Sequence, residues 1–264
     1  MKIALTTSTY GSVDLYEALR RIHAFGYDAI EITGIKGQHI VTDEFGPEKS
    51  TPLKAELDKI GLAVSAMTSG PCPPLAGEDT LRYVHTSIDL AARLGAKVVI
   101  TYVTKSPQAE GKKESEWRPD VCERISSLAD YAHSKGLRLA LETEPGFLVD
   151  NPRAGIALVR EIGHPFLGYN LCIPHILPTI APGETVHDII DLAADLILNT
   201  HIADIKNRVH KHLVPGEGEV DFPALFAHLG RIGYKGYFTW DLYPYAQQSD
   251  FAAQKVMDFV RQLR

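Results

Sequence analysis

The sequence has few cysteines, no long apolar run and no signal sequence. Its three cysteines, Cys72, Cys122 and Cys172, form no C-x-x-C pair, which argues against a disulfide framework and a zinc knuckle, so we expect reduced thiols. No window reaches the roughly 18 unbroken apolar residues of a membrane span. The segment MKIALTTSTYG lacks a signal peptide's long apolar region and small-residue cleavage site. We therefore expect a cytoplasmic protein without a membrane partner.

A surplus of basic residues is also missing. The formal net charge is −6, so the chain has no basic footprint for a polyanion, although a bound divalent cation would reverse the sign locally. We expect no nucleic-acid partner, and homo-oligomerisation stays open. With 45% hydrophobic and 23% charged residues over 264 positions, the composition is that of a globular chain long enough for one (β/α)8 domain.

The chain repeats one pattern: an amphipathic helical run, then Gly, then a short β-rich run, as in AARLGAKVVITYV and LGRIGYKGYFTW. Each glycine is predicted to end a helix in the left-handed conformation before the next strand. The marker glycines are Gly26, Gly61, Gly95, Gly136, Gly163 and Gly233. The last interval is twice as long as a typical one, because it includes a helix over 185–194 that leads into ADLILNTHI without a glycine.

These units add up to a closed fold. With the opening strand KIALTTS, eight strands alternate with eight helices, of which the last is DFAAQKVMDFVRQL. Continuous apolar and β-branched runs such as KVVITYV are typical of parallel strands covered on both faces. The sequence therefore predicts an α/β protein, a single-domain (β/α)8 TIM barrel over residues 1–264. A doubly wound open sheet is the alternative.

The segments that follow the strands are unusually long. In (β/α)8 barrels the strand C-terminal ends and these loops carry the chemistry, whereas the opposite loops serve stability. Surface insertion would explain any single long loop, but four on one face favour a functional site. The four are TGIKGQHIVTDEFGPEKS, TSGPCPPLAGED, TKSPQAEGKKESEWRP and KNRVHKHLVPGEGEV.

Polar side chains gather where strands five to eight end. Strand five ends in LALETEPG, which places Glu142 and Glu144 on one side of the strand. Burying a carboxylate in an apolar strand costs free energy unless the group is paired or bound to metal. Several carboxylates that converge on one barrel mouth therefore predict a bound cation. Oxygen and imidazole ligands suit Mn, Co, Mg or Zn. The later strands contribute Asn170, Cys172, His175, His201, Asp204, Lys206, Arg208 and Asp241.

This pattern resembles the xylose-isomerase-like sugar phosphate isomerase/epimerase superfamily over nearly the whole chain. The segments that carry the resemblance are LALETEPG, HIAD, PGEGEVDF and GYKGYFTWDLY. The resemblance implies one divalent metal ion held by Glu142, Cys172, His201 and Asp241. The family's strand-six signature D-x-x-H, whose His contacts substrate, corresponds here to Cys172-Ile-Pro-His175.

Cys172 departs from the aspartate of that signature. A thiolate ligand would shift the preference from Mg or Mn toward Zn or Co. Three alternatives remain: Asn170 supplies an oxygen instead, metal binding has weakened, or Cys172 is a small buried hydrophobe.

Four residues are predicted to bind substrate, namely His175, Arg208, Glu144 and Trp117. Trp117 and Tyr243 would form an apolar wall for a sugar face, or else pack at the barrel rim. Asp204 would support the metal site or pair with Lys206 or Arg208.

The segment VHKHLVPGEGE is predicted to be loop. We expect His210 and His212 to be solvated, and Gly216 and Gly218 to serve backbone conformation. PGEGE lacks the spacing of a phosphate-binding loop.

The predicted chemistry is proton abstraction next to a carbonyl. A metal-dependent isomerase or epimerase of a sugar or sugar-like polyol ketone would pass through an enediolate, with Glu142 and Asp241 as catalytic carboxylates on opposite sides of a small carbohydrate substrate. One alternative is a lyase or dehydratase of a keto-sugar or keto-inositol, or a glycoside-cleaving relative. Another is a catalytically lapsed barrel that binds a small molecule. A phosphodiesterase resembling endonuclease IV is disfavoured, because strands three and four end in AMTSG and TYVTK without histidine.

Overall fold

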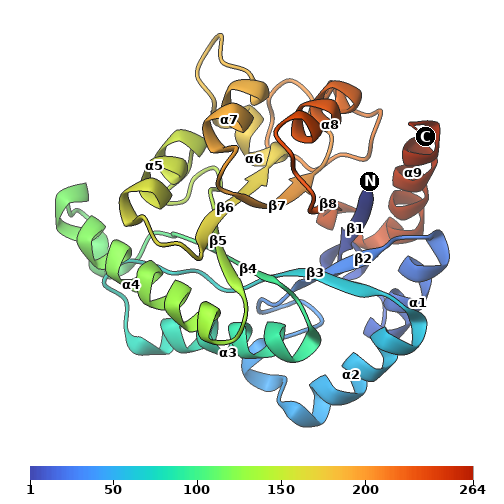
Figure 1. Cartoon of the computed structure of the whole chain (residues 1–264), viewed down its shortest axis with the longest axis horizontal. Helices are drawn as coiled ribbons and strands as arrows, with labels where there is room; N and C mark the ends of the chain where they lie inside the picture. Colours follow the sequence, from blue (N-terminus) through green and yellow to red (C-terminus); the bar gives the residue numbers. More distant parts are fainter. Residues whose placement is uncertain (264) are drawn as a thin grey trace.

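The computed structural model describes residues 1–263 and contains one closed sheet of eight parallel strands in chain order (Figure 1). The strand β8 closes onto β1 through pairs from Lys2–Tyr237 to Leu5–Trp240. The predicted (β/α)8 barrel is confirmed, and the open-sheet alternative is wrong. The strands are β1 (Lys2–Thr6), β2 (Ala29–Thr33), β3 (Ala63–Thr68), β4 (Val98–Tyr102), β5 (Arg138–Glu142), β6 (Leu167–Cys172), β7 (Ile197–Ile202) and β8 (Tyr237–Trp240).

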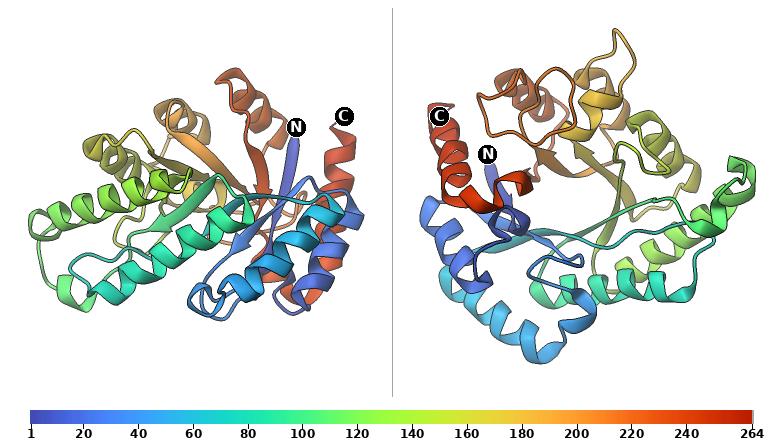
Figure 2. Two further views of the ribbon diagram at one scale, coloured as in Figure 1. Left: turned by 60° about the horizontal axis from the view of Figure 1, so that its bottom comes forward. Right: turned by 180° about the vertical axis from the view of Figure 1, so that it is seen from behind.

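The α-helices surround this barrel, and β1 and α9 lie side by side in every view (Figures 1 and 2). The described residues form one α-helix more than the eight that the sequence predicts. The additional helix is IPHILPT, a short helix directly after β6. Pro174 in its first turn suits a helix start and could not donate to a sheet ladder. The described helices are α1 (Leu15–Phe25), α2 (Pro47–Ile60), α3 (Glu78–Leu94), α4 (Glu114–Ser134), α5 (Pro152–Ile162), α6 (Ile173–Thr179), α7 (Val186–Ala193), α8 (Phe222–Arg231) and α9 (Ser249–Gln262).

The helix-to-strand connections are short, as expected. They range from residues 61–62 to residues 232–236. All six marker glycines have positive φ, between 62° and 95°, which confirms that they end helices in the left-handed conformation. The helix α7 ends with Ala194 as its C-terminal cap, without a glycine, as the sequence predicts. Its start is marked by a capping box between Thr185 and Asp188.

The segment after β4 is a shorter loop than the sequence suggested. ESEWRP belongs to α4, because the Lys113 backbone N–H donates to Glu116 Oε2 at 2.9 Å and starts the helix early. Trp117 therefore stands on a helix rather than on a loop.

Two irregularities in the sheet lie beside buried polar residues. The register shifts between Ile30 and Glu31 where β2 pairs with β3, and between Tyr169 and Asn170 where β6 pairs with β7. Such a shift re-aims the side chains that follow it. Glu31 and Asn170 come directly after the two shifts, and both are fully buried.

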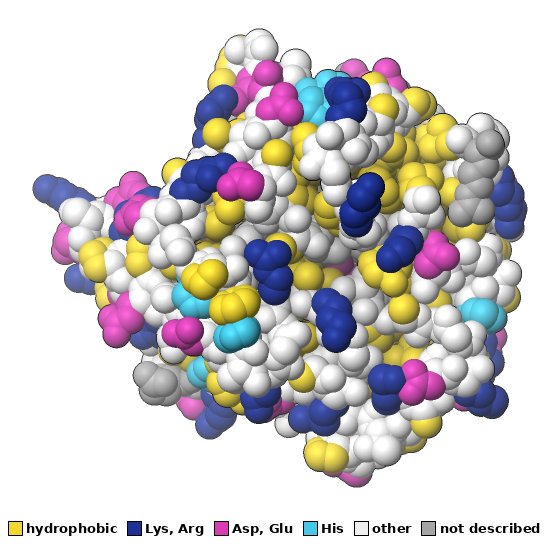
Figure 3. Space-filling view, viewed as in Figure 1, with side chains coloured by type: hydrophobic (Ala, Val, Ile, Leu, Met, Phe, Trp, Pro, Cys, Tyr) yellow, Lys and Arg dark blue, Asp and Glu magenta, His cyan; other side chains and the backbone are white. Residues whose placement is uncertain are grey.

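The surface carries both signs of charge. On the face in Figure 3, Lys and Arg side chains lie over the middle, with Asp and Glu interspersed.

All three cysteines are free. Within residues 1–263, no helix has the length and apolar character needed to cross a membrane.

Candidate functional site

A cavity of about 230 Å³ opens at the C-terminal ends of the strands. Five of the predicted site residues line it together: Glu142, Glu144, His175, His201 and Asp241. Glu142 ends β5, His201 lies near the end of β7, and Asp241 directly follows β8. Because parallel strands bring their C-terminal ends to one rim, residues distant in sequence meet here.

His201 lies between two buried carboxylates. Its Nε2 is 2.8 Å from Glu31 Oε1, and its Nδ1 is 3.1 Å from Glu142 Oε1. Burial alone would lower the pKa of His201, but Glu31 and Glu142 raise that pKa well above its ordinary value. The two carboxylates therefore favour the protonated form of this histidine.

Glu31 is the site residue that sequence reasoning missed. It is completely buried on β2, and its oxygens accept hydrogen bonds from Thr68 Oγ1 at 2.7 Å and Asn199 Nδ2 at 2.9 Å. The signal was present in AIEIT, a lone carboxylate in an apolar strand. A carboxylate in this second strand is as costly to bury without a partner as one in strands five to eight.

Glu142 and Asp241 are both ionised at neutral pH. Burial alone would raise the pKa of Glu142, but His201 and His175 hold it well below its ordinary value. At Asp241 burial also opposes ionisation, yet His212, whose Nδ1 lies 3.1 Å from Oδ2, lowers the pKa to about 2. Both side chains can therefore act as anionic ligands or as bases.

His175 and Glu144 complete the polar wall. His175, on α6, is buried, and its Nδ1 lies 2.9 Å from the Thr143 carbonyl oxygen and 3.2 Å from Glu142 Oε1. Glu144 is half-buried, and burial raises the pKa of its carboxyl. The two residues lie where substrate hydroxyls could contact them.

The donor set fits a divalent cation. One ligand atom each from Glu142, Cys172 and His201 lies within 4.8 Å of the others, and all three residues are buried. Since Nε2 of His201 faces Glu31, Nδ1 is the nitrogen available to an ion shared with Glu142. Burial raises the pKa of the Cys172 thiol, and a bound ion would displace that proton. A carboxylate, an imidazole and a thiolate together suit Zn or Co.

Asn170 is committed to other partners. Its Oδ1, the atom that could bind a cation, already accepts from Asn199 Nδ2 at 3.0 Å, and its Nδ2 lies 3.1 Å from His201 Nδ1, a contact that an ion on that nitrogen would replace. This arrangement favours Cys172 over Asn170 as the ligand from β6.

The histidines of VHKHL are placed differently from the sequence expectation. His212 is fully buried, so the prediction of a solvated residue is wrong for it, and His210 is half-buried. Ring nitrogens of His175, His210 and His212 lie within 4.8 Å of one another. This distance is within the range for ligands of one metal ion. Burial and the two neighbouring histidines lower the pKa of His210 to about 4. Among residues 1–263, Nε2 of His210 and Nε2 of His212 have no hydrogen-bond partner.

Asp204 explains why this loop turns inward. Its backbone pairs with Leu213 in both directions, at 2.8 and 2.9 Å. Its carboxylate accepts the backbone N–H groups of Gly216 and Gly218 on Oδ2 and that of Val220 on Oδ1. The side chain therefore fastens the loop rather than pairing with a lysine or arginine.

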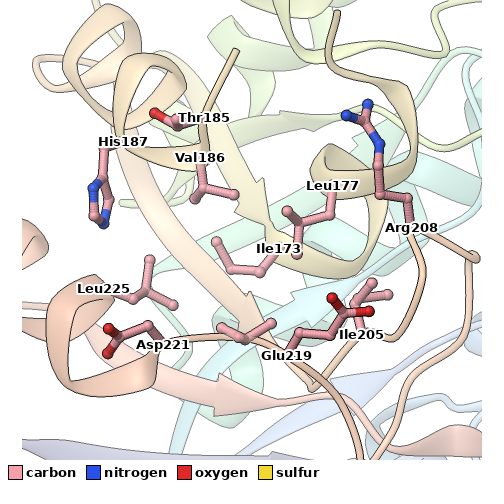
Figure 4. Close-up of a pocket in the computed structure, with 11 residues that line it drawn as sticks. Ile173, Leu177, Thr185, Val186, His187, Ile205, Arg208, Glu219, Asp221 and Leu225 are labelled. Carbon is pink, nitrogen blue, oxygen red and sulfur yellow. The ribbon is translucent and has the colours of Figure 1, made fainter. Parts of the chain in front are cut away.

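Two predicted substrate-binding residues lie outside the barrel-mouth cavity. Trp117 is 6% exposed and packs in the hydrophobic core, because α4 begins early and turns the ring inward. Tyr243, which the sequence paired with Trp117, does line the cavity, together with Tyr102. Arg208 lines a separate pocket of about 330 Å³ beside α6 and α7, where Figure 4 shows its guanidinium at the far side from His187. That guanidinium donates to the Ile180 carbonyl.

Comparison with known proteins assigns the fold to a family. Residues 19–263 match the family described as xylose isomerase-like TIM barrel. The chain belongs to this family. A ketose 3-epimerase of Arthrobacter globiformis is 25% identical over 250 residues, covering 87% of this chain and 78% of the relative.

Two further relatives extend the comparison. A 3-dehydroshikimate dehydratase of Pseudomonas putida is 24% identical over 264 residues, which cover 94% of this chain but 39% of the relative. Among solved structures, the IolI protein with a bound zinc atom superimposes with a TM-score of 0.81 at 18% identity, over 99% of this chain and 97% of that one. The chain is therefore similar in sequence to an epimerase and to a dehydratase, and it shares its fold with a zinc-binding protein.

Proposed function

We propose that this xylose isomerase-like barrel is a metal-dependent isomerase or epimerase of a sugar or sugar-like polyol ketone. One observation carries the proposal: Glu142 and Asp241 line one small cavity together with His201, and Cys172 lies within ligand distance of Glu142 and His201. The similarity to a ketose 3-epimerase supports a small carbohydrate substrate.

Glu142, Cys172, His201 and Asp241 would hold one divalent ion. The zinc bound by the IolI protein supports this assignment, and the thiolate favours Zn or Co over Mn or Mg. When bound, such an ion polarises a ketone and lowers the free energy of the enediolate.

The two carboxylates would move the proton. Glu142 comes from β5 and Asp241 from the end of β8, so they approach a bound substrate from different strands. One would take the proton from the carbon beside the carbonyl, and the other would return a proton to the opposite face, which inverts that carbon. Thr6 Oγ1 donates to Asp241 Oδ1 at 3.0 Å and helps to fix its orientation.

His175 and Glu144 would bind substrate hydroxyls. Both line the cavity, and each side chain offers at least one polar atom toward it. The aromatic wall of this site would come from Tyr243, as the sequence predicts, and from Tyr102, which takes the place predicted for Trp117.

A dehydratase is the second candidate, and the similarity to 3-dehydroshikimate dehydratase favours it. The first step would be the same proton abstraction by Glu142 or Asp241. If one carboxylate alone is competent, the enediolate loses a β-hydroxyl or isomerises instead of being reprotonated on the other face.

A product screen tests the proposal and separates the candidates. The protein is loaded separately with Zn, Co, Mn and Mg and incubated with a panel of ketoses and keto-inositols, and the products are identified by NMR. An epimer or isomer supports the main proposal, and loss of water supports the dehydratase. Binding of panel members without any product would show a lapsed barrel. His201→Ala should remove both metal and activity, and circular dichroism must show that the barrel still folds, because the change leaves the buried carboxylates of Glu31 and Glu142 without their partner.

A further inference from the structure

A cavity of about 450 Å³ lies at the N-terminal end of the barrel, opposite the mouth. The residues around the starts of β3, β4 and β8 line this basal cavity, together with the ends of α2 and α3. It reaches Asn199 on β7, which is buried and whose Nδ2 donates to Glu31 Oε2 at 2.9 Å. Within residues 1–263, no residue lines both this cavity and the one at the mouth. The basal cavity is therefore a separate space beneath the candidate metal site.

Two basic side chains belong to the inner face of the barrel at this end. Successive side chains point to opposite faces of a strand. On β5, Glu142 lines the barrel-mouth cavity and Ala140 packs inside the barrel, so Arg138 shares their inner face. On β1, Thr6 lines the mouth, which places Lys2 on the inner face as well. Because β1 and β5 lie on opposite sides of the closed barrel, the two cations face each other across its end.

Lys97 and Tyr237 connect these cations to the basal cavity. Lys97 lines the cavity, and its carbonyl oxygen accepts the Arg138 backbone N–H at 3.0 Å. Tyr237 also lines the cavity, and the Lys2 ammonium lies 5.4 Å from the centre of its ring. Figure 1 shows the N-terminus, at the start of β1, on the near side of the molecule, and Figure 3 shows Lys and Arg side chains over the middle of that face.

The acids near this end do not neutralise its positive charge. Asp58 lines the cavity but pairs with Lys54, and Asp28 Oδ2 accepts the Ile3 backbone N–H at 2.7 Å. Partial burial lowers the pKa of the Arg138 guanidinium, and no acid among the described side chains counteracts that shift. A cation withdrawn from water is costly unless an anion pairs with it. The basal cavity therefore has an unmatched surplus of positive charge, although the whole chain has a net charge of −6.

We propose that the basal cavity binds a small phosphorylated metabolite, with its phosphate between Arg138 and Lys2 and its body in the cavity toward Asn199. The guanidinium of Arg138 and the ammonium groups of Lys2 and Lys97 supply the donors and the charge that a phosphate requires. The cavity volume falls within the roughly 300–1,000 Å³ of small-ligand sites, which favours a metabolite over a flat macromolecular surface. The inference is independent of the proposed function, because the site uses none of the residues at the barrel mouth.

The test follows the binding of 3-phosphoglycerate, a probe that has no ketone, by phosphorus NMR on the full chain with and without zinc. The probe should bind equally well in both forms, because the candidate zinc site lies in the other cavity. Arg138→Gln should weaken binding roughly tenfold, the loss expected for one hydrogen bond to a charged group. Lys97→Gln should also weaken it. Lys255→Gln removes an exposed cation on α9 and is the matched control, for which we expect no change.

A conservative variant separates the loss of charge from a loss of structure. Arg138→Lys keeps the positive charge and should retain most of the affinity for 3-phosphoglycerate. The side chains changed in these variants are exposed, so the circular dichroism spectrum should stay the same.

Four results would overturn the inference. The first is the absence of saturable binding, and the second is an equal affinity in all the variants. The third is binding only when zinc is present, which would place the phosphate at the barrel mouth. The fourth is an equal loss of affinity in Lys255→Gln, since it would show unspecific attraction to positive charge anywhere on the surface.

Discussion

His201 Nε2 and Glu31 Oε1 lie 2.8 Å apart inside the barrel. This contact determines which imidazole nitrogen faces Glu142 and Cys172, because a nitrogen that donates to a carboxylate cannot also bind a metal. A carboxylate behind a metal-binding histidine fixes the tautomer and raises the basicity of the ligand nitrogen. Glu31 is thus a positioning residue for the proposed metal site.

Glu31→Gln should weaken metal binding by about 10- to 100-fold, the usual cost of losing such a partner. The amide keeps the shape but offers one accepting oxygen where Thr68, Asn199 and His201 all donate. The measurement is a zinc titration against a competing chelator. Glu17→Gln on the exposed face of α1 is the control. Unchanged affinity with an intact fold would show that Glu31 has no influence on the site.

Cys172 should ligate the metal through its sulfur. Cobalt-loaded protein should show a thiolate-to-cobalt charge-transfer band in the near ultraviolet, and Cys172→Ser should abolish it. Cys122→Ser changes a half-buried thiol on α4 and should leave the band in place. A band that survives Cys172→Ser would mean that this thiol is packing only. In addition, Cys172→Asp should move the preference toward Mg and Mn.

Neutralising either catalytic carboxylate should lower turnover. Glu142→Gln and Asp241→Asn keep the shape but remove the base, which is worth roughly 10²- to 10⁴-fold in rate, with further loss if the metal leaves. Glu144→Gln should cost far less, because that residue is assigned to substrate contact. Metal content is measured in parallel with kcat. Full activity with either amide would refute the assignment.

Asp204 should stabilise the loop that carries His210 and His212. Asp204→Ala removes the acceptor for the Gly216, Gly218 and Val220 N–H groups, and leaving buried donors unpaired costs about 1–3 kcal/mol in the free energy of unfolding. Urea denaturation measures the loss. Asp258→Ala, at an exposed ion pair on α9, should change stability by less than about 1 kcal/mol.

The sequence specified the barrel more completely than the site. Alternating helix and strand patterns, and glycines that end helices, depend on local backbone physics, so all eight strands could be found from short windows. The residues of strands five to eight could be gathered because parallel strands end at one rim. The early start of α4 depends on the Lys113–Glu116 cap, a weak local signal, so the sequence pattern alone assigns Trp117 to a loop.

Other parts of the site depend on long-range contacts. Glu31 reaches His201 across 170 positions of sequence, and no local pattern pairs them. His212 is fully buried in a loop in which Asp204 accepts the backbone N–H groups of Gly216, Gly218 and Val220, and these contacts exist only in the folded loop. Arg208 has a positive φ of 54° and lies on the outer side of that loop, so its place in the sequence after β7 did not bring it to the cavity.

Solvent exchange at the reacting carbon tests the central claim most directly. The metal-loaded protein is incubated in deuterium oxide with a ketose or keto-inositol that the screen identifies, and deuterium beside the carbonyl is followed by NMR. The account predicts that deuterium enters at that carbon with turnover. It also predicts that Glu142→Gln slows this entry by at least about 10²-fold. Product that forms without deuterium, or exchange that is as fast in Glu142→Gln as in the unaltered protein, would contradict it.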